Sequence, residues 1–464
     1  MPLSLSNALI CFSILELGLG DVNAVHILAN GNIVLSTDGD DSLPGLSFED
    51  EDLIERDEMV VTVTHSGYIK RTPLDTFRAQ ARGGKGRSGM ATKDEDAVVE
   101  MFVTSTHNPV LFFTNTGRVY RLKVWKLPEG GPQTKGRPMV NLLPLGEDER
   151  VTNVLPLPED ESEWDKLNIV FATEQGMVRR NSMDAFTNVP SNGKYAMGFV
   201  DGSGDRLIGV ELLTEDQEIF LASDSGKAIR FSATDARETK SRTGIGVRGM
   251  KLKDGQKVVS MAVLDAGERD TEVRDAYLRA AQWKNNDAEA TLDAEKIDAM
   301  SDGEEFILTL TSRGYGKISS AYEYRTIGRG GMGLTNIGEP SDKNRNGAVV
   351  ASFPVKHGSQ LMLVTDQAKL IRLPVDFRHM VEGGFENHIG YSVSGRSSSG
   401  VRIFNVSKDE QIVGAALIDE TEEPENEAEE TIAEEMVERR GGGDETAPDT
   451  TPHSDKDIEG DTEE

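Results

Sequence analysis

Six segments of the chain share one pattern of hydrophobic and polar positions. Each begins with a run of β-branched or aromatic residues, passes through a short polar turn that usually closes on glycine, and continues as a short run ending in Lys or Arg. Two such runs joined by a tight turn are typical of a β-hairpin. The six predicted hairpins cover residues 59–71, 111–122, 169–180, 219–231, 307–318 and 361–373.

The residues around each hairpin recur as well. A basic, glycine-containing loop follows each hairpin, and a further apolar strand follows the loop, which gives three to four strands in about 50 residues. One open sheet with that many strands is implausible. Six such units instead favour a radial arrangement of blades, which leaves only short edges exposed. The predicted fold class is therefore all-β, with six propeller-like blades over residues 59–418.

Other segments depart from this pattern. Residues 266–303 are rich in Ala and charge and poor in β-branched residues, so we expect a helical insertion of one or two helices there. Residues 419–464 are acidic and lack aromatic residues, which predicts a disordered tail. Residues 49–58 are interpreted as an acidic linker. Residues 1–48 receive no structural assignment.

Charge is distributed unevenly along the chain. The formal net charge is −30, but residues 1–58 hold 12 acidic and one basic residue, and residues 419–464 hold 20 and three. Residues 265–305 hold a further 13 acidic and five basic residues, which leaves 41 basic and 35 acidic residues for the rest. Local charge decides which partners a surface attracts, so the sequence predicts a basic core between acidic appendages.

Composition narrows the possible function classes. The single cysteine, Cys11, excludes an internal disulfide and a cysteine-based zinc site, and the seven His show no metal-binding spacing. The apolar run at 8–20 is too short to span a bilayer and lacks the flanks of a signal peptide, so we expect a cytoplasmic protein with no membrane partner. No catalytic motif is found, and we expect no catalytic residue, metal or cofactor in this chain.

The basic residues repeat with the blades. A ring of cations suits a long polyanion that follows a curved path, and glycine allows a backbone to approach phosphate closely. Such binding reads backbone and shape rather than bases. The candidate rim residues are Lys70, Arg71, Arg78, Arg87, Arg118, Arg121, Lys135, Arg137, Arg179, Arg180, Lys194, Lys227, Arg230, Arg242, Arg248, Lys317, Arg325, Arg329, Lys369, Arg372, Arg396 and Arg402.

Two function classes fit this pattern. One is a module that wraps nucleic acid, and the other is a protein-interaction or chromatin-type propeller that does not wrap DNA. The most basic loop, 79–90, reads AQARGGKGRSGM. It is not a nucleotide-binding P-loop, because Gly86 stands where the hydroxyl that ligates Mg²⁺ is required. A solvated surface turn and a contact to nucleic acid remain as interpretations of this loop.

Within that loop, Gln80, Ala81, Arg82, Gly83, Gly84, Lys85 and Gly86 resemble the Q-R-R-G-G-K-G box of the C-terminal domain of bacterial DNA gyrase A, part of a type IIA topoisomerase. The resemblance extends from about residue 49 to 420. It implies a six-bladed β-pinwheel, in which strands are exchanged between blades and duplex DNA is wrapped with positive writhe. It also implies that the box, on the first blade, is needed for wrapping.

The resemblance further implies partners outside this chain. These are the gyrase A breakage-reunion domain and the gyrase B subunit, in an A2B2 holoenzyme at the nucleoid, with ATP and Mg²⁺ used elsewhere in that assembly for negative supercoiling. Two departures from the family pattern stand out. Ala81 replaces the first Arg of the box, and residues 1–48 do not resemble the breakage-reunion domain with its catalytic Tyr.

Overall fold

The computed structural model describes residues 54–76, 98–132, 134–281, 283, 292–338, 346–367, 369–377 and 391–418, together with the backbone of two strands near the N-terminus. Those two strands, β1 (Val22–Ile27) and β2 (Ile33–Thr37), pair antiparallel within a segment that the sequence left unassigned. The box residues 80–86, Arg78, Arg87 and the tail 419–464 lie outside the described residues.

Each predicted hairpin lies in a sheet of its own, and in the first five blades it forms the centre of that sheet. A polar turn joins its two strands, and the apolar strand that follows pairs with the first strand of the hairpin. The hairpins are β3 (Glu58–Thr64) with β4 (Tyr68–Pro73), β6 (Pro109–Thr114) with β7 (Arg118–Lys123), β10 (Asn168–Thr173) with β11 (Met177–Ser182), β14 (Glu218–Ser223) with β15 (Lys227–Ser232), β18 (Phe306–Thr311) with β19 (Tyr315–Ser320), and β22 (Ser359–Thr365) with β23 (Leu370–Val375).

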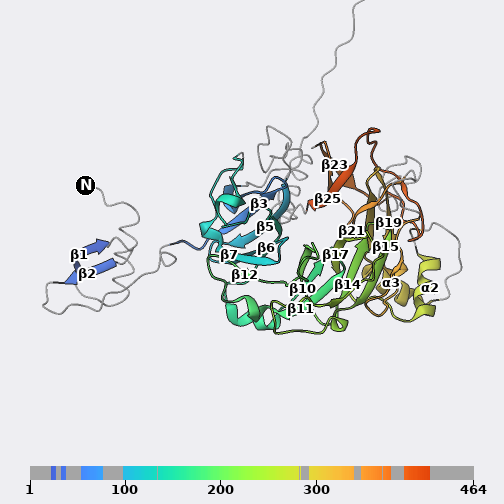
Figure 1. Ribbon diagram of the computed structural model, residues 1–464, viewed down its shortest axis with the longest axis horizontal. Coiled ribbons are helices and arrows are strands. Elements are labelled where there is room, and N and C mark those ends of the chain that lie inside the picture. Colours follow the sequence, from blue (N-terminus) through green and yellow to red (C-terminus); the bar gives the residue numbers. More distant parts are fainter. Residues whose placement is uncertain are drawn as a thin grey trace, which may run out of the picture. The chain divides into compact units, whose positions relative to one another are not determined.

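The strands that follow lie at the inner edges of the six sheets. They are β5 (Val98–Ser105), β9 (Val151–Pro156), β13 (Leu207–Leu213), β17 (Val258–Leu264), β21 (Val349–Val355) and β25 (Ile412–Ile418). Contacts run from β9 through β13, β17, β21 and β25 to β5, so these strands surround a common axis. Figure 1 shows the sheets arranged as blades around that axis, which confirms the predicted six-bladed all-β fold.

A two-residue strand is exchanged between neighbouring blades. The loop after each of the second to sixth hairpins returns to the preceding blade and adds a strand to the outer edge of its sheet, so β8, which follows β7 in the chain, pairs with β4. The exchanged strands are β8 (Arg137–Pro138), β12 (Lys194–Tyr195), β16 (Val247–Arg248), β20 (Leu334–Thr335) and β24 (Val401–Arg402). This agrees with the strand exchange that the resemblance implied.

Each hairpin turn is fixed by the same local chemistry. In five of the described turns the closing glycine has φ between +74° and +81°, the left-handed conformation that glycine adopts at low cost. A Thr or Ser three residues earlier accepts a hydrogen bond through its hydroxyl from the first amide after the glycine position, as Thr114 does from Arg118 at 3.2 Å. The hydroxyls belong to Thr64, Thr114, Thr173, Ser223, Thr311 and Thr365.

Among the described residues, short 3-10 turns follow the second hairpin strand in five blades, and two further turns lie in the loops of the second and third blades. Those after the hairpins are η2 (Leu74–Thr76), η3 (Val124–Lys126), η6 (Met183–Phe186), η7 (Ala233–Asp235) and η9 (Ala321–Glu323). The others are η4 (Met139–Asn141) and η5 (Glu161–Lys166). The hydrophobic core lies between the blades, where apolar side chains of adjacent sheets pack together, for example Phe113, Phe171 and Phe186.

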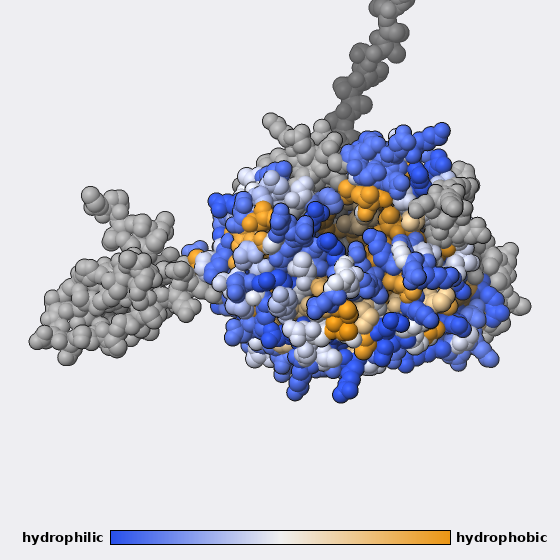
Figure 2. All heavy atoms as spheres, viewed as in Figure 1, coloured by the Kyte–Doolittle hydropathy of each residue, from blue (hydrophilic) through white to orange (hydrophobic). Residues whose placement is uncertain are grey.

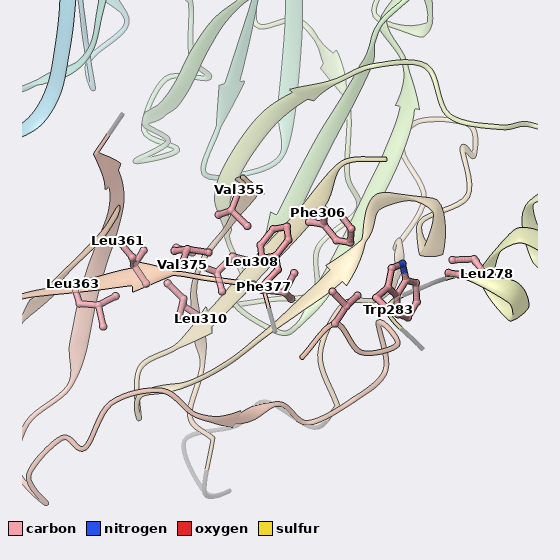
Figure 3. Close-up of a cluster of buried hydrophobic side chains, with 14 of the residues drawn as sticks. Leu278, Trp283, Phe306, Leu308, Leu310, Val355, Leu361, Leu363, Val375 and Phe377 are labelled. Carbon is pink, nitrogen blue, oxygen red and sulfur yellow. The ribbon is translucent and has the colours of Figure 1, made fainter. Parts of the chain in front are cut away.

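The helical insertion lies between the fourth and fifth hairpins. It contains α2 (Thr271–Ala280) and α3 (Ala294–Asp302), which confirms the helical assignment from the sequence. Asp270 caps α2 by accepting hydrogen bonds from the amides of Glu272 and Val273. Leu278 and Trp283 of the insertion belong to the same buried cluster as side chains of the last two blades (Figure 3). None of the helices described is long and apolar enough to cross a membrane.

Candidate nucleic-acid interface

The cations of the hairpins divide into two groups by their distance from the turn. The fourth residue after the glycine turn is Arg71, Arg121, Arg180 or Arg230 in the first four blades. Each guanidinium donates a hydrogen bond to a backbone carbonyl in or next to the 3-10 turn of the following blade. The acceptors are the carbonyls of Leu127, Thr187, Ala236 and Ala321. We call these contacts the seam braces, because they join each of these blades to the next.

The brace at Arg230 is the most deeply buried of the four. Arg230 and Glu218 are 2% and 0% exposed, and their ion pair spans 2.5 Å. Glu218 also accepts a hydrogen bond from the Thr326 hydroxyl at 2.9 Å, and Arg230 also donates to the carbonyl of Asp265. Loss of one partner leaves an uncompensated buried charge, which is strongly destabilising. Arg230 is therefore placed to stabilise the fold and is not accessible to a ligand.

A second set of hairpin cations lies three residues after the turn. Lys70, Arg179 and Lys317 are buried in the first, third and fifth blades. Lys70 Nζ donates to the carbonyls of Gly131 and Pro132 at 3.0 and 2.8 Å. Arg179 donates in the same way to the carbonyl of Gly244, and Lys317 donates to that of Gly395. Both acceptors lie in the loop that follows the next hairpin and packs beside the donor's own blade. These cations fix the loop that carries each exchanged strand back to the preceding blade.

Burial lowers the pKa of all three groups. Desolvation lowers the pKa of Lys70 to about 8 and that of Lys317 to about 7. It also lowers the pKa of the Arg179 guanidinium to about 10, with a smaller contribution from Arg242. Lys70, Arg179, Arg180, Arg230 and Lys317, all predicted as rim residues, thus lie inside the ring. The structure gives them hydrogen bonds between blades in place of an exposed position.

The exposed cations lie instead at the outer edges of the blades. We define the outer belt as the five segments that carry the exchanged strands, residues 135–140, 192–200, 242–251, 328–338 and 395–402. Their 44 residues contain nine Lys or Arg and no Asp or Glu. Because the whole chain carries a net charge of −30, this composition sets the belt apart from the rest of the molecule. The belt is the part of the described surface best suited to a polyanion.

Hydrogen bonds join neighbouring belt segments to one another. The amide of Gly198 donates to the carbonyl of Gly244 at 3.3 Å, and that of Gly330 donates to Gly249 at 2.6 Å. Gly338 donates to the carbonyl of Ser398 at 3.0 Å. Four of the segments, from 192 to 402, are thereby linked in order around the edge of the ring. The belt is one connected backbone surface in this part of the chain.

Aromatic side chains hold several cations at this edge. Lys135 Nζ lies 4.2 Å from the ring centroid of Tyr68, and the Arg402 guanidinium lies 5.2 Å from that of Tyr315. Arg118, on a hairpin strand, lies 5.5 Å from the ring of Tyr195 on the exchanged strand beside it. These distances are in the range of a cation–π interaction. The rings therefore help to position these cations at the edge of the ring.

The other predicted rim residues take several positions. Within the belt, Lys194, Arg242, Arg329 and Arg396 are half-buried or exposed, and Arg137 and Arg248 are exposed. Lys227 lies beside the belt and donates to Thr335 at 3.0 Å. Arg325, Lys369 and Arg372 are exposed outside the belt. Arg78, Arg87 and the box residues Gln80, Ala81, Arg82, Gly83, Gly84, Lys85 and Gly86 lie outside the described residues, so their role stays a prediction.

The belt glycines serve packing. Gly136 and Gly400 immediately precede exchanged strands, and both have positive φ. A Cβ at either position would lie 2.5 Å from a backbone carbonyl oxygen, that of Ile69 or Gly316 respectively. Glycine is needed there because the exchanged strand approaches the hairpin so closely. Close packing therefore accounts for the glycine at these two positions without a phosphate ligand.

Sequence reasoning missed several functional and structural residues. Lys251 is an exposed belt cation that was not predicted. The Thr and Ser hydroxyls of the turns were also missed, although their fixed distance before the turn glycine is a signal that the sequence contains. Among the residues described, no group of three or more His, Cys, Asp or Glu is placed to hold a metal ion.

A family model described as the DNA gyrase C-terminal domain, beta-propeller, matches residues 58–105, 108–158, 167–214, 217–265, 305–356 and 390–419. Together these segments make up more than half of the chain. Each of the first five segments covers a hairpin and the inner strand that follows it, and the last ends on β25. The repeat found from the sequence is therefore the repeat of this family.

Curated relatives extend the same similarity. The chain is 47% identical to the DNA gyrase A protein of Rickettsia bellii (strain RML369-C) over 399 residues, which are 83% of this chain and 42% of that protein. It is 36% identical to the DNA gyrase A protein of Staphylococcus epidermidis (strain ATCC 12228 / FDA PCI 1200) over 375 residues, 81% of this chain and 36% of that protein. The chain thus spans about two fifths of the length of these relatives.

Solved structures share the fold at lower sequence identity. The C-terminal domain of DNA topoisomerase IV matches with a TM-score of 0.59 at 19% identity, over 84% of this chain and 100% of that one. The C-terminal domain of DNA gyrase A matches with a TM-score of 0.50 at 22% identity, over 78% of this chain and 99% of that one. At these identities the similarity shows the six-bladed fold alone.

Proposed function

Because this chain belongs to the DNA gyrase C-terminal domain family, we propose that it binds duplex DNA along its outer belt and wraps it with positive writhe. In this proposal the chain works in the cytoplasm, at the nucleoid, with the gyrase A breakage-reunion domain and the gyrase B subunit. The holoenzyme then supercoils DNA negatively, with ATP and Mg²⁺ bound elsewhere in the assembly. This chain itself contributes DNA binding and needs no cofactor.

The observation that carries the proposal is the composition of the outer belt. Nine cations and no acidic residue lie in segments that follow the edges of five blades. Lys135, Arg137, Arg248 and Arg402 are exposed members of this set, spread along the belt from its first segment to its last. A duplex that passes along the edge meets cations at successive blades and is held in a curve.

The energetics require many such contacts. Bending a site of 20–30 base pairs through 40–90° costs on the order of 1–6 kcal/mol by elastic estimates. Contacts to phosphate offset this cost, and six to ten of them make the affinity fall roughly 10³- to 10⁵-fold between 50 and 200 mM salt. The belt cations together with Arg118 and Lys227 beside it are sufficient in number. Such contacts position the duplex without reading its bases.

Residues 80–86, which resemble the family box, add a specific anchoring site to this proposal. Residues 80–86 follow the hairpin of the first blade in the chain, and Arg82 and Lys85 match the family box. We infer that they anchor the wrap, so that replacing both with Ala reduces the writhe more than it reduces binding. Ala81 removes one cation of the box, while Arg78 and Arg87 supply others close by in the sequence.

The dependence of binding on DNA length and salt tests the proposed function. Full-length chain is titrated with duplexes from short to long at several salt concentrations. A wrapping module binds long duplexes much more tightly, with a steep loss of affinity as salt rises. A protein-interaction propeller is indifferent to DNA length. Binding that is weak and independent of length would contradict the proposal and support that alternative.

A further inference from the structure

The outer belt also gathers most of the exposed hydrophobic side chains of the ring. Nine large hydrophobic residues of the described chain are exposed, and six of them lie in the belt. They are Val140, Tyr195, Val200, Ile245, Met332 and Val401, with exposures from 41% to 64%. Every belt segment contributes at least one. Single exposed apolar residues are ordinary, but such a concentration in one narrow surface marks a contact site.

The apolar residues alternate with the cations at the edge. Four of the five exchanged strands consist of one cation and one nonpolar or aromatic residue: Arg137–Pro138, Lys194–Tyr195, Val247–Arg248 and Val401–Arg402. Ile245 and Met332 each stand two residues before an exchanged strand, in segments joined by the bond from Gly330 to Gly249. Figure 2 shows separate hydrophobic patches among hydrophilic residues on one face of the ring.

The partner of such a surface must be both anionic and partly apolar. Duplex DNA meets both requirements, because phosphates line the edges of its minor groove, deoxyribose forms the walls and base edges form the floor. Proteins that bend DNA through the minor groove insert apolar side chains between base steps beside their cations. An acidic protein surface could pair with the cations. The absence of any acidic residue in the belt favours the more uniformly charged polyanion.

We propose that five of these exposed apolar residues, one from each belt segment, Val140, Tyr195, Ile245, Met332 and Val401, pack against the sugars and base edges of the wrapped duplex and bend it at each blade. The adjacent cations hold the phosphates on either side. This inference rests on the proposed function and adds the element that sets curvature. It predicts that bending and charge neutralisation are separable, since different residues carry them.

Three variants of the full-length chain test the inference. The first, the apolar set, combines Val140→Ser, Tyr195→Ser, Ile245→Ser, Met332→Ser and Val401→Ser. The second is a matched control at the three exposed apolar residues outside the belt, Leu74→Ser, Val103→Ser and Val413→Ser. The third, the cation set, combines Lys135→Gln, Arg137→Gln, Arg248→Gln and Arg402→Gln. Binding to a long duplex is measured at several salt concentrations, with plasmid writhe and the melting temperature.

Apolar contacts release no counterions, so the salt dependence separates the two mechanisms. The apolar set should bind roughly tenfold more weakly or worse at every salt concentration, with an unchanged slope of log affinity against log salt and reduced writhe. The cation set should lower that slope by about 0.9 for each lost phosphate contact. The control set should match the wild type. If the apolar set unfolds, Met332→Ser and Val401→Ser are measured singly and should each reduce writhe.

Unchanged affinity and writhe in the apolar set would overturn the inference, and so would an equal loss in the control set. In either case weaker binding by the cation set leaves the proposed function standing. If the wild-type chain fails to bind long duplexes at all, the proposed function fails and this inference fails with it.

Discussion

The seams between the blades and the outer belt use the same residue types for opposite purposes. At the seams, buried or half-buried Arg side chains donate to backbone carbonyls of the next blade, as Arg180 does to Ala236. At the belt, cations such as Arg137 and Arg248 are exposed on exchanged strands. The difference follows from the strand that carries the cation, because the braces lie on the second hairpin strand, four places past the turn, and the belt cations lie in the segments of the exchanged strands. Charge alone therefore does not identify a binding residue in this fold.

In the part of the chain that the structure describes, the seam between the fifth and sixth blades has no Arg brace and is apolar instead. Ile318 stands where the first four blades have Arg, and the cluster around it includes Leu361, Leu363 and Phe377 of the sixth blade (Figure 3). Trp283 of the helical insertion joins this cluster. Of the first five seams described, the one without an Arg brace is thus the seam where the helical insertion adds buried hydrophobic side chains. The comparison suggests that the braces specify how blades align, while hydrophobic packing supplies most of the stability.

The largest expected effect comes from breaking one brace. Arg230→Met leaves Glu218 buried without its main partner and should lower the free energy of unfolding by about 3–5 kcal/mol. Arg372→Met changes the equivalent position of the sixth blade, where the side chain is exposed, and should cost less than about 1 kcal/mol. Urea denaturation of both variants checks this. Equal losses at the two positions would mean that burial at the seam is not what matters.

The belt should show the reverse behaviour. Replacing Lys135, Arg137, Arg248 and Arg402 with Gln removes four predicted phosphate contacts and should weaken DNA binding on the order of 10²-fold near 150 mM salt, with the salt slope reduced by roughly three to four. Stability should change little, because these side chains are exposed. Titrations at several salt concentrations measure the slope. A fall in melting temperature without a change in slope would place these cations with the seams instead.

The pH dependence of stability distinguishes the two groups further. The pKa of Lys317 is lowered from an ordinary value of 10.5 to about 7, mainly by burial; the charge of Glu323 opposes this shift and that of Arg396 adds to it. Between these values the unfolded chain holds a proton that the folded chain has released, so the free energy of unfolding should rise with pH. Lys317→Met should remove a rise on the order of a few kcal/mol between pH 7 and 10.

Urea denaturation at pH 7, 8.5 and 10 measures this difference, with the exposed Lys369→Met as the control variant. The control should keep the pH dependence of the wild type. If Lys317→Met also keeps it, the lysine is charged in the folded ring and its burial is balanced by another group.

The smallest effect is expected from the acidic tail. Residues 419–464 carry 20 acidic and three basic residues and can compete with DNA for the belt. Their deletion should tighten DNA binding by about two- to threefold at 50 mM salt and have almost no effect at 200 mM, where exposed charges are screened. Binding at both salt concentrations tests this. An affinity that the deletion leaves unchanged at 50 mM would show that the tail and the belt do not interact.

The sequence predicted the repeating parts of the fold because each hairpin contains its own signal. The predicted hairpin at 59–71 corresponds to β3 and β4, and the Ala-rich segment became α2 and α3. The exchanged strands are two residues long, too short to show a hydrophobic period, and their pairing depends on contacts between blades. The burial of Lys70 was unpredictable for the same reason, since its acceptors lie more than 60 residues away in the chain.

The sequence therefore predicted which residue types form the candidate site, but it did not predict which of those residues lie together on the surface. Recurrence of Lys and Arg indicated the ring of charge, and the structure divided that set into braces and belt. Val401 and Met332 gave no signal in the sequence, because an apolar residue in a strand or close to one is expected to be buried. Only the position of the exchanged strands at the outer edge shows that these side chains are exposed.

The writhe of a closed circular plasmid tests the central claim most directly. The plasmid is relaxed by a topoisomerase in the presence of the full-length chain, and the change in linking number is compared between the wild type and the belt variant with Lys135, Arg137, Arg248 and Arg402 replaced by Gln. We predict a positive change for the wild type and little or none for the belt variant at the same melting temperature. An equal positive change in both proteins would contradict the assignment of DNA wrapping to the outer belt.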